Sequence, residues 1–231
     1  MVEIAGKPIL WHIMKNYADQ GVTEFIVCLG YKGFQIKEYF TNYFLHTSDI
    51  SIDLSKNSVE IHSTSTEDWK VTLVDTGDLT QTGGRLKRIK RYLPEGDFYM
   101  TYGDGLSNVD LGELKKSHLA SGAMATVTVV QPKGRFGVID FEEGRIRGFQ
   151  EKPRDNSAHV SAGYFIIAKE CLNLIVDDQS SWEELTLPHL ASNNQLNAYF
   201  HSGFWQPMDT LRDRNLLESL WNDGKPPWKI S

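Results

Sequence analysis

Apolar residues near the start of the chain follow two different periods. The continuous apolar run 25–29 predicts a buried strand that ends at Gly30. Helical spacing before and after that strand predicts two amphipathic helices, the first with Pro8 in its first turn and Gly21 as its stop. The residues that carry this spacing are Leu10, Ile13, Met14 and Tyr17 in the first helix, and Ile36, Tyr39, Phe40, Tyr43 and Phe44 in the second. A strand, a glycine and a helix in succession form the βα unit of a parallel sheet.

The same pattern returns twice further along the chain. The run 71–74 precedes helical spacing at Leu86, Ile89 and Leu93, and the run 97–102 precedes helical spacing at Leu111, Leu114 and His118. Between these units, alternating apolar residues on either side of 56–57 predict a hairpin over 50–61. A mostly parallel sheet is therefore the fold that the first half predicts.

The second half of the chain mixes strands with short helices. Strands are predicted at 123–130 and 163–168, with a hairpin over 137–147 between them and a late helix over 210–221. This half is expected to complete the sheet and cover its ligand-binding face. No repeat, low-complexity tract or linker interrupts the sequence, so we expect a single domain over residues 1–231.

Composition narrows the class of protein. The 231 residues are 40% hydrophobic and 23% charged, which are globular values. The formal net charge of −6 argues against nucleic acid as a partner. No apolar run approaches the roughly 20 residues of a membrane helix, so we expect a cytoplasmic protein without membrane contact. An anionic small substrate would then need Lys, Arg or a metal ion at its site.

Asp104 is the first candidate for chemistry. It follows the apolar run 97–102 and stands between Gly103 and Gly105. The crevice outside the carboxyl ends of the strands is where open α/β sheets bind ligands, and a carboxylate there suits a hard cation such as Mg²⁺. The glycines would let a phosphorylated ligand approach the backbone. A plain turn, with Asp104 as its hydrogen-bonding residue, is the alternative.

Two loops offer candidate binding groups. Thr82, Gly83 and Arg85 lie where a strand leads into a helix N-terminus, whose free N–H groups favour anions or base-edge acceptors. Arg85 could add a bidentate phosphate contact, or lie on a solvated helix face behind a glycine-rich connector. Glu151 and Lys152 could bind a sugar hydroxyl and a phosphate, or form a solvated pair before a turn proline.

Asp209 is a second candidate carboxylate, directly ahead of the helix predicted over 210–221. Aspartate is a preferred N-cap, which is one interpretation of this position. Two carboxylates from distant parts of a chain are also the usual way to hold a Mg²⁺ ion that binds substrate phosphates. The two roles do not exclude each other.

Taken in order, these segments resemble the sugar-1-phosphate nucleotidylyltransferases. The similarity runs from Met1 to about Trp228. Its specific parts are residues 6–12, 74–78, 82–88, 101–105, 149–153 and 204–212, of which the last is typical of the cytidylyltransferase branch. The resemblance implies a Rossmann-like, mixed and mostly parallel sheet with helices on both faces. It also implies that CTP and glucose 1-phosphate give CDP-glucose and pyrophosphate, in a pathway to bacterial surface polysaccharides. Members are commonly homo-oligomers, so we expect one here.

The resemblance also implies a role for each matching residue. Asp104 and Asp209 would hold Mg²⁺ and, with Lys152, form the catalytic group. The nucleotide would contact Gly103 and the loop that carries Thr80, Thr82, Gly83 and Arg85. Glu151 and Lys152 would bind the sugar and its phosphate, and Gly137 and Tyr164 would line the sugar pocket.

The sequence departs from the family pattern at two places. Relatives carry a strand and a Gly-Gly-x-Gly-Thr-Arg loop before the position of Met1, so we expect an N-terminally truncated domain that lacks the first strand and has little activity. Residues 161–163 are Ser-Ala-Gly where relatives have Asn-Gly-Gly, which puts one sugar-hydroxyl contact in question. Alternatives to a cytidylyltransferase are a uridylyl- or thymidylyltransferase of the same family, a non-catalytic sugar-phosphate-binding subunit, and a metal-dependent glycosyltransferase.

Overall fold

The computed structural model of the chain describes residues 2–64, 66–132, 138–142, 145–150 and 159–229. The chain folds into two compact units. The first unit contains the residues up to Gly96 together with Lys169–His189, and the second contains Asp97–Ala168 and the residues from Leu190 onward. Neither unit is continuous in the sequence, because each is completed by a segment from the second half of the chain.

The first unit is built around the parallel strand pair that the βα pattern predicts. Strand β3 lies beside β6 with Glu24 opposite Lys70 and Leu29 opposite Asp75. The elements of this unit are β1 (Glu3–Ile4), β2 (Lys7–Pro8), α1 (Ile9–Ala18), β3 (Glu24–Leu29), α2 (Gly33–Thr41), α3 (Tyr43–Thr47), β4 (Ser48–Asp53), β5 (Ser58–Thr64), β6 (Lys70–Asp75), α4 (Thr82–Ile89), η1 (Lys90–Tyr92), η2 (Lys169–Leu174) and η3 (Trp182–Thr186); α6 (Leu187–Ser192) continues into the second unit. The carboxyl ends of β3 and β6 therefore form one edge, and the loop into α4 leaves from it.

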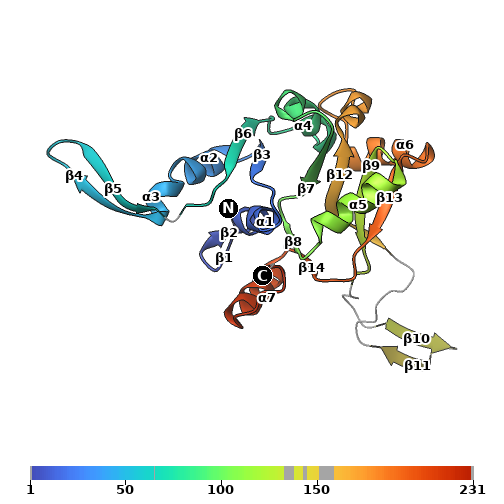
Figure 1. Cartoon of the computed structure of the whole chain (residues 1–231). Coiled ribbons are helices and arrows are strands. Elements are labelled where there is room, and N and C mark those ends of the chain that lie inside the picture. Colours follow the sequence, from blue (N-terminus) through green and yellow to red (C-terminus); the bar gives the residue numbers. More distant parts are fainter. Residues whose placement is uncertain (1, 65, 133–137, 143–144, 151–158, 230–231) are drawn as a thin grey trace. The chain divides into compact units, whose positions relative to one another are not determined.

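Most local predictions for this unit are confirmed. Helix α1 buries Ile13, Met14 and Tyr17 of the predicted apolar face, and Gly21 follows it with φ +89°. Pro8 is the N-cap of this helix and does not lie in its first turn as predicted. The hairpin β4–β5 turns at Asn57, whose φ is +49°, and it projects beyond α3 (Figure 1). The single helix predicted over 36–44 is wrong, because the chain leaves helical geometry at Asn42 and forms the two helices α2 and α3. Asparagine competes for backbone hydrogen bonds and is a poor interior helix residue.

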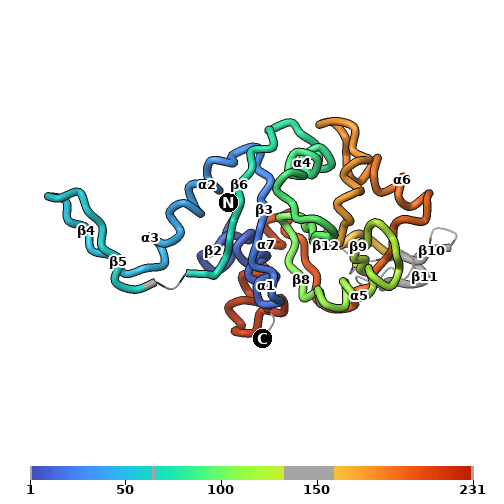
Figure 2. The backbone as a smooth tube through the Cα atoms, turned by 45° about the horizontal axis from the view of Figure 1, so that its top comes forward, coloured from blue at the N-terminus to red at the C-terminus, as the bar shows by residue number. Residues whose placement is uncertain are grey.

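The second unit contains a mixed four-stranded sheet in the order β13-β9-β12-β7. Strand β13 is parallel to β9, and β12 is antiparallel to both β9 and β7. Helix α5 packs against β9 and β13, and Figure 2 shows it beside β9. The elements of this unit are β7 (Asp97–Thr101), β8 (Gly105–Ser107), α5 (Leu111–Ser121), β9 (Ala125–Val130), β10 (Val138–Glu142), β11 (Arg145–Gln150), β12 (Val160–Ala168), β13 (Leu196–Phe200), β14 (Trp205–Pro207) and α7 (Leu211–Asn222).

The predicted α/β class with a mixed sheet is confirmed. The prediction that the sheet is mostly parallel does not hold for the described strands, because β12 runs antiparallel to both of its neighbours, β9 and β7. Strands β9 and β12 are buried along nearly their whole length, as continuous apolar runs predict. The hairpin β10–β11 forms where the sequence predicts it. Among the described strands, β3–β6 and β9–β13 are the parallel pairs and the other pairs are antiparallel. No helix among the described residues is both long enough and apolar enough to cross a bilayer.

Candidate functional site

The backbone of the second unit brings Asp104 and Asp209 together. Strand β8 pairs with β14 in antiparallel register, with Gly105 opposite Pro207. One step beyond this ladder, the amide of Met208 donates to the carbonyl of Asp104 at 2.8 Å. The two carboxylates therefore leave the same end of a two-stranded ladder, although they lie far apart in the sequence.

The negative charge of Asp209 acts on the carboxyl group of Asp104. Asp104 keeps contact with solvent, but the protein around its carboxyl group removes part of its hydration and raises its pKa, and the negative charge of Asp209 raises that pKa further. Two like charges repel each other, and a cation bound to both would offset the repulsion. Two oxygen ligands with room for water or phosphate oxygens match the requirement of Mg²⁺. Within the described residues, no cluster of three or more His, Cys, Asp or Glu side chains offers a metal site.

Asp209 does not cap the helix that follows it, so that interpretation of the sequence is wrong. Thr210 is the N-cap of α7: its hydroxyl accepts from the amide of Asp213, and the Asp213 carboxylate accepts from the amide of Thr210 at 3.0 Å. This reciprocal capping box satisfies the first turn of the helix. Asp209 lies one residue before the cap and is exposed.

Tyr164 fixes the chain directly after Asp104. Its hydroxyl donates to the carbonyl of Gly105 at 2.9 Å, and the side chain is only 1% exposed. Burial raises the pKa of the Tyr164 hydroxyl, with a smaller contribution from the charge of Asp104, so the hydroxyl remains a donor. The sequence predicts that Tyr164 lines a sugar pocket; that role stays a prediction, and the contact seen here holds the Asp104 loop.

Trp205 and Tyr102 are parts of this region that sequence reasoning missed. The indole of Trp205 donates to the carbonyl of Ala162 at 2.9 Å and ties β14 to the start of β12. Gly163 has φ +77°, and a Cβ atom there would lie 2.7 Å from the ring of Tyr102. Gly103 has open space where a Cβ would be, so the backbone beside Asp104 is accessible on that side. The expected contact of Gly103 with a nucleotide stays a prediction.

Arg85, in the first unit, spans the ends of β3 and β6. Its guanidinium donates to the carbonyl of Leu29 at 3.1 Å, to the hydroxyl of Thr76 at 2.8 Å and to the carbonyl of Asp78 at 3.4 Å. A Cβ on Gly30 would lie 2.7 Å from this guanidinium, so a larger residue there would displace it. The solvated-face interpretation of Arg85 is therefore wrong, and its predicted phosphate contact would use the donor positions that these bonds leave.

The first turn of α4 has both occupied and available amides. The amide of Gln81 donates to the Asp178 carbonyl at 2.8 Å, and the amide of Gly84 donates to the Ser180 carbonyl at 3.1 Å. Within the described part of the chain, the amides of Thr82 and Gly83 have no such partner. Thr80 is buried. The turn thus keeps two N–H donors of the kind that the sequence predicts for a ligand.

Three predicted substrate residues, Gly137, Glu151 and Lys152, lie outside the residues that the structure describes. Their predicted roles toward the sugar and its phosphate stay predictions. The described candidate residues come from both units: Thr80, Thr82, Gly83 and Arg85 from the first, and Gly103, Asp104, Tyr164 and Asp209 from the second.

Known proteins are similar to this chain over nearly its whole length. The model of the nucleotidyl transferase family matches residues 1–223. The chain is 50% identical over 230 residues to the glucose-1-phosphate cytidylyltransferase of Salmonella typhi, covering 99% of this chain and 90% of that one. It is 38% identical over 228 residues to the probable glucose-1-phosphate cytidylyltransferase of Bacillus subtilis, covering 98% and 89%.

Solved structures agree on the fold. HddC from Yersinia pseudotuberculosis superposes with a TM-score of 0.70 at 20% identity, covering 96% of this chain and 88% of that one. A UDP-glucose pyrophosphorylase complexed with UDP-glucose superposes with a TM-score of 0.65 at 13% identity, covering 97% and 90%. At these identities the likeness concerns the α/β fold alone.

Proposed function

This chain belongs to the nucleotidyl transferase family, and we propose that it makes CDP-glucose and pyrophosphate from CTP and glucose 1-phosphate. The observation that carries the proposal is the Asp104–Asp209 pair at the end of the β8–β14 ladder. The choice of CTP and glucose 1-phosphate rests on the relative at 50% identity, because nothing in the geometry of the described residues distinguishes cytosine from uracil or thymine.

The reaction is a displacement at phosphorus. An oxygen of the glucose 1-phosphate attacks the α-phosphorus of CTP, the new P–O bond forms, and the bond to the departing pyrophosphate breaks. The attacking oxygen is already anionic, so no strong base is needed. Positioning of the two phosphates and stabilisation of charge in the transition state supply the rate.

Asp104 and Asp209 would hold Mg²⁺ in this scheme. When bound, the ion offsets the negative charge of the triphosphate and orients its oxygens. The raised pKa of Asp104 fits this role, since the repulsion from Asp209 that contributes to it is energy that a cation recovers. Tyr164 would keep the Asp104 loop in position through its bond to Gly105.

The remaining predicted residues would bind the substrates. We infer that the amides of Thr82 and Gly83 and the guanidinium of Arg85 face the nucleotide. Lys152 would hold the attacking phosphate, and Glu151 a sugar hydroxyl. A homo-oligomer, as is common in the family, stays part of the proposal.

Release of pyrophosphate from CTP, UTP and dTTP with glucose 1-phosphate, with and without Mg²⁺, tests the proposal. We expect Mg²⁺-dependent release that is fastest with CTP, and its loss in Asp104→Asn. Asp68→Asn is the matched control, because Asp68 is an exposed aspartate of the first unit. Faster release with UTP or dTTP would overturn the base assignment. Binding of glucose 1-phosphate without any release would overturn the enzymatic function.

A further inference from the structure

The segment Val176–Glu183 of the first unit lies along α4, and we propose that it is a clasp that positions the nucleotide-facing turn, with Glu183 as its key residue. The inference rests on the proposed function of that turn. Every second residue of the clasp meets α4 or the residue before it. Lys87 donates through its side chain to the carbonyl of Val176. The amide of Gln81 donates to the carbonyl of Asp178, and the amide of Gly84 donates to that of Ser180. The amide of Trp182 donates to the hydroxyl of Thr82.

Thr82 is the centre of the contact. Its hydroxyl donates to the Glu183 carboxylate at 2.5 Å and accepts from the amide of Trp182 at 3.0 Å. A hydroxyl has a single proton to donate, so Thr82 has none left to offer a nucleotide through its side chain. What the turn can still offer is its backbone N–H groups, whose direction depends on how Thr82 is held.

The clasp requires the two glycines of the turn. A Cβ on Gly83 would lie 2.6 Å from the carbonyl oxygen of Ser180, and one on Gly84 would lie 2.6 Å from that of Asp178. Real Cβ atoms do not approach backbone this closely, so any larger residue would push the clasp away. The sequence predicts a nucleotide contact at Gly83; in the structure the missing side chains of the glycine pair make room for the clasp.

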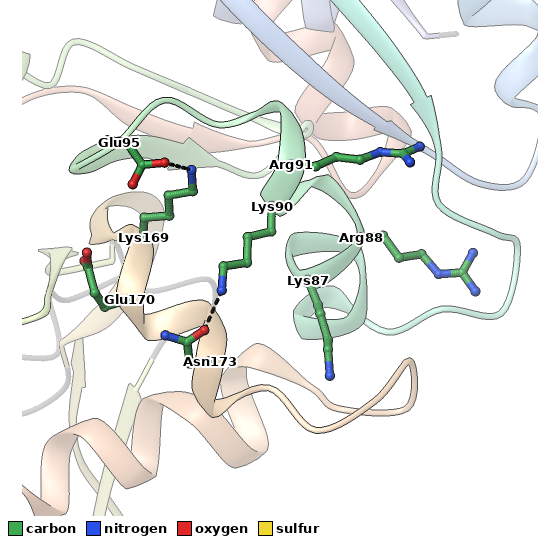
Figure 3. Close-up of a pocket in the computed structure, with 8 residues that line it drawn as sticks. All are labelled: Lys87, Arg88, Lys90, Arg91, Glu95, Lys169, Glu170 and Asn173. Carbon is green, nitrogen blue, oxygen red and sulfur yellow. Dashed lines mark hydrogen bonds and ion pairs between the residues drawn. The ribbon is translucent and has the colours of Figure 1, made fainter.

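The other end of α4 is tied to the same part of the chain. Arg88 forms a two-point ion pair with Asp178, with Nε to Oδ1 at 2.9 Å. Lys90 donates to Asn173 at 2.5 Å across a groove of about 620 Å³, where Figure 3 shows Lys169 pairing with Glu95. The bonds of Lys87 and Arg88 hold the last turn of α4, so a loss at Thr82 would loosen the first turn without releasing the helix.

The Glu183 carboxylate is the clasp group that can be removed with the least disturbance of packing. It is exposed, whereas Trp182 next to it is fully buried. Glu184 is also exposed, lies in the same η3 turn and supplies a matched control, because no hydrogen bond joins its carboxylate to α4 among the described residues. Glu183 also accepts from the hydroxyl of Ser181 at 3.0 Å, a bond within the clasp itself. In a Thr82→Val background the bond between Thr82 and Glu183 is already absent, so any further effect of Glu183→Ala comes from the bond to Ser181.

Two measurements on the full chain test the clasp. We expect Glu183→Ala to weaken CTP binding by about fivefold, or about 1 kcal/mol, which is the net worth of a typical hydrogen bond. The KM for glucose 1-phosphate should remain that of Glu184→Ala. Amide hydrogen exchange at 82–85 should be faster in Glu183→Ala than in Glu184→Ala. In a Thr82→Val background, Glu183→Ala should have little further effect.

The outcomes separate the clasp from the proposed function. If the unmodified chain binds CTP and Glu183→Ala binds it equally well, the clasp has no positioning role, whatever the turnover. Equal effects of Glu183→Ala with and without Thr82→Val would also overturn it, because Glu183 would then act elsewhere. If the unmodified chain neither binds CTP nor releases pyrophosphate, the proposed function fails. Unchanged hydrogen exchange at 82–85 would then reject the clasp itself.

Discussion

Replacing Asp209 by Asn should change stability and activity in opposite directions. Partial burial raises the pKa of Asp104 and the charge of Asp209 raises it further, so in the metal-free protein the two carboxylates repel each other. Both are exposed, and screened surface pairs are worth a few tenths to about 1 kcal/mol. Removing one charge should therefore raise the melting temperature in EDTA by about 1–3 °C for a chain of this size.

The stability difference between Asp209→Asn and the unmodified chain should depend on pH. A group whose folded pKa is raised favours folding most when it is protonated, and this contribution is lost as the pH rises through the folded pKa. The stability difference between Asp209→Asn and the unmodified chain should thus be close to zero below the ordinary carboxyl pKa and reach its full value at neutral pH. Thermal unfolding in EDTA from pH 3 to 8 measures it.

Activity should move the other way. Metal-assisted stabilisation of transition-state charge is worth several kcal/mol, so loss of one ligand should lower kcat by at least about a hundredfold. Added Mg²⁺ should stabilise the unmodified chain and leave Asp209→Asn unchanged. Asp68→Asn is the control in each measurement. A variant that is less stable in EDTA at neutral pH, or that keeps its turnover, would refute the shared site.

Three further substitutions test the structure around this pair. Thr210→Ala removes the capping box of α7 and should cost about 1 kcal/mol, seen as a lower urea midpoint with an unchanged slope. Gly163→Ala adds a Cβ 2.7 Å from the ring of Tyr102 at φ +77°, and should destabilise by more than about 1 kcal/mol; an unchanged midpoint would contradict the strain. Tyr164→Phe leaves the carbonyl of Gly105 without its donor and should cost about 1–3 kcal/mol in the same assay, whereas a neutral effect would mean that the bond is dispensable.

Hydrophobic periodicity predicted most elements of both units, because burial on one face is a local property of the sequence. The start of a helix was harder to predict, because two neighbouring residues can both be suitable N-caps. Asp209 and Thr210 are both good N-caps, and the preference of aspartate for this position favours the first. The capping box identifies the second, since an acidic residue, Asp213, stands three positions after Thr210. The glycines at 83 and 84 were ambiguous for a different reason: glycine permits close approach of a ligand and of another chain segment equally well.

The Asp104–Asp209 pair depends on information that local pattern does not contain. Strands β8 and β14 have three residues each, too few for alternation to specify a register. A slip of one residue would move Asp209 by about 3.3 Å along the ladder and turn its side chain to the opposite face. The register is fixed instead by contacts outside the ladder, among them the Tyr164 hydroxyl on Gly105 and the Trp205 indole on Ala162. The sequence therefore predicts each carboxylate as a candidate from its neighbouring residues. The side chains that align β8 with β14 bring the two carboxylates into one site.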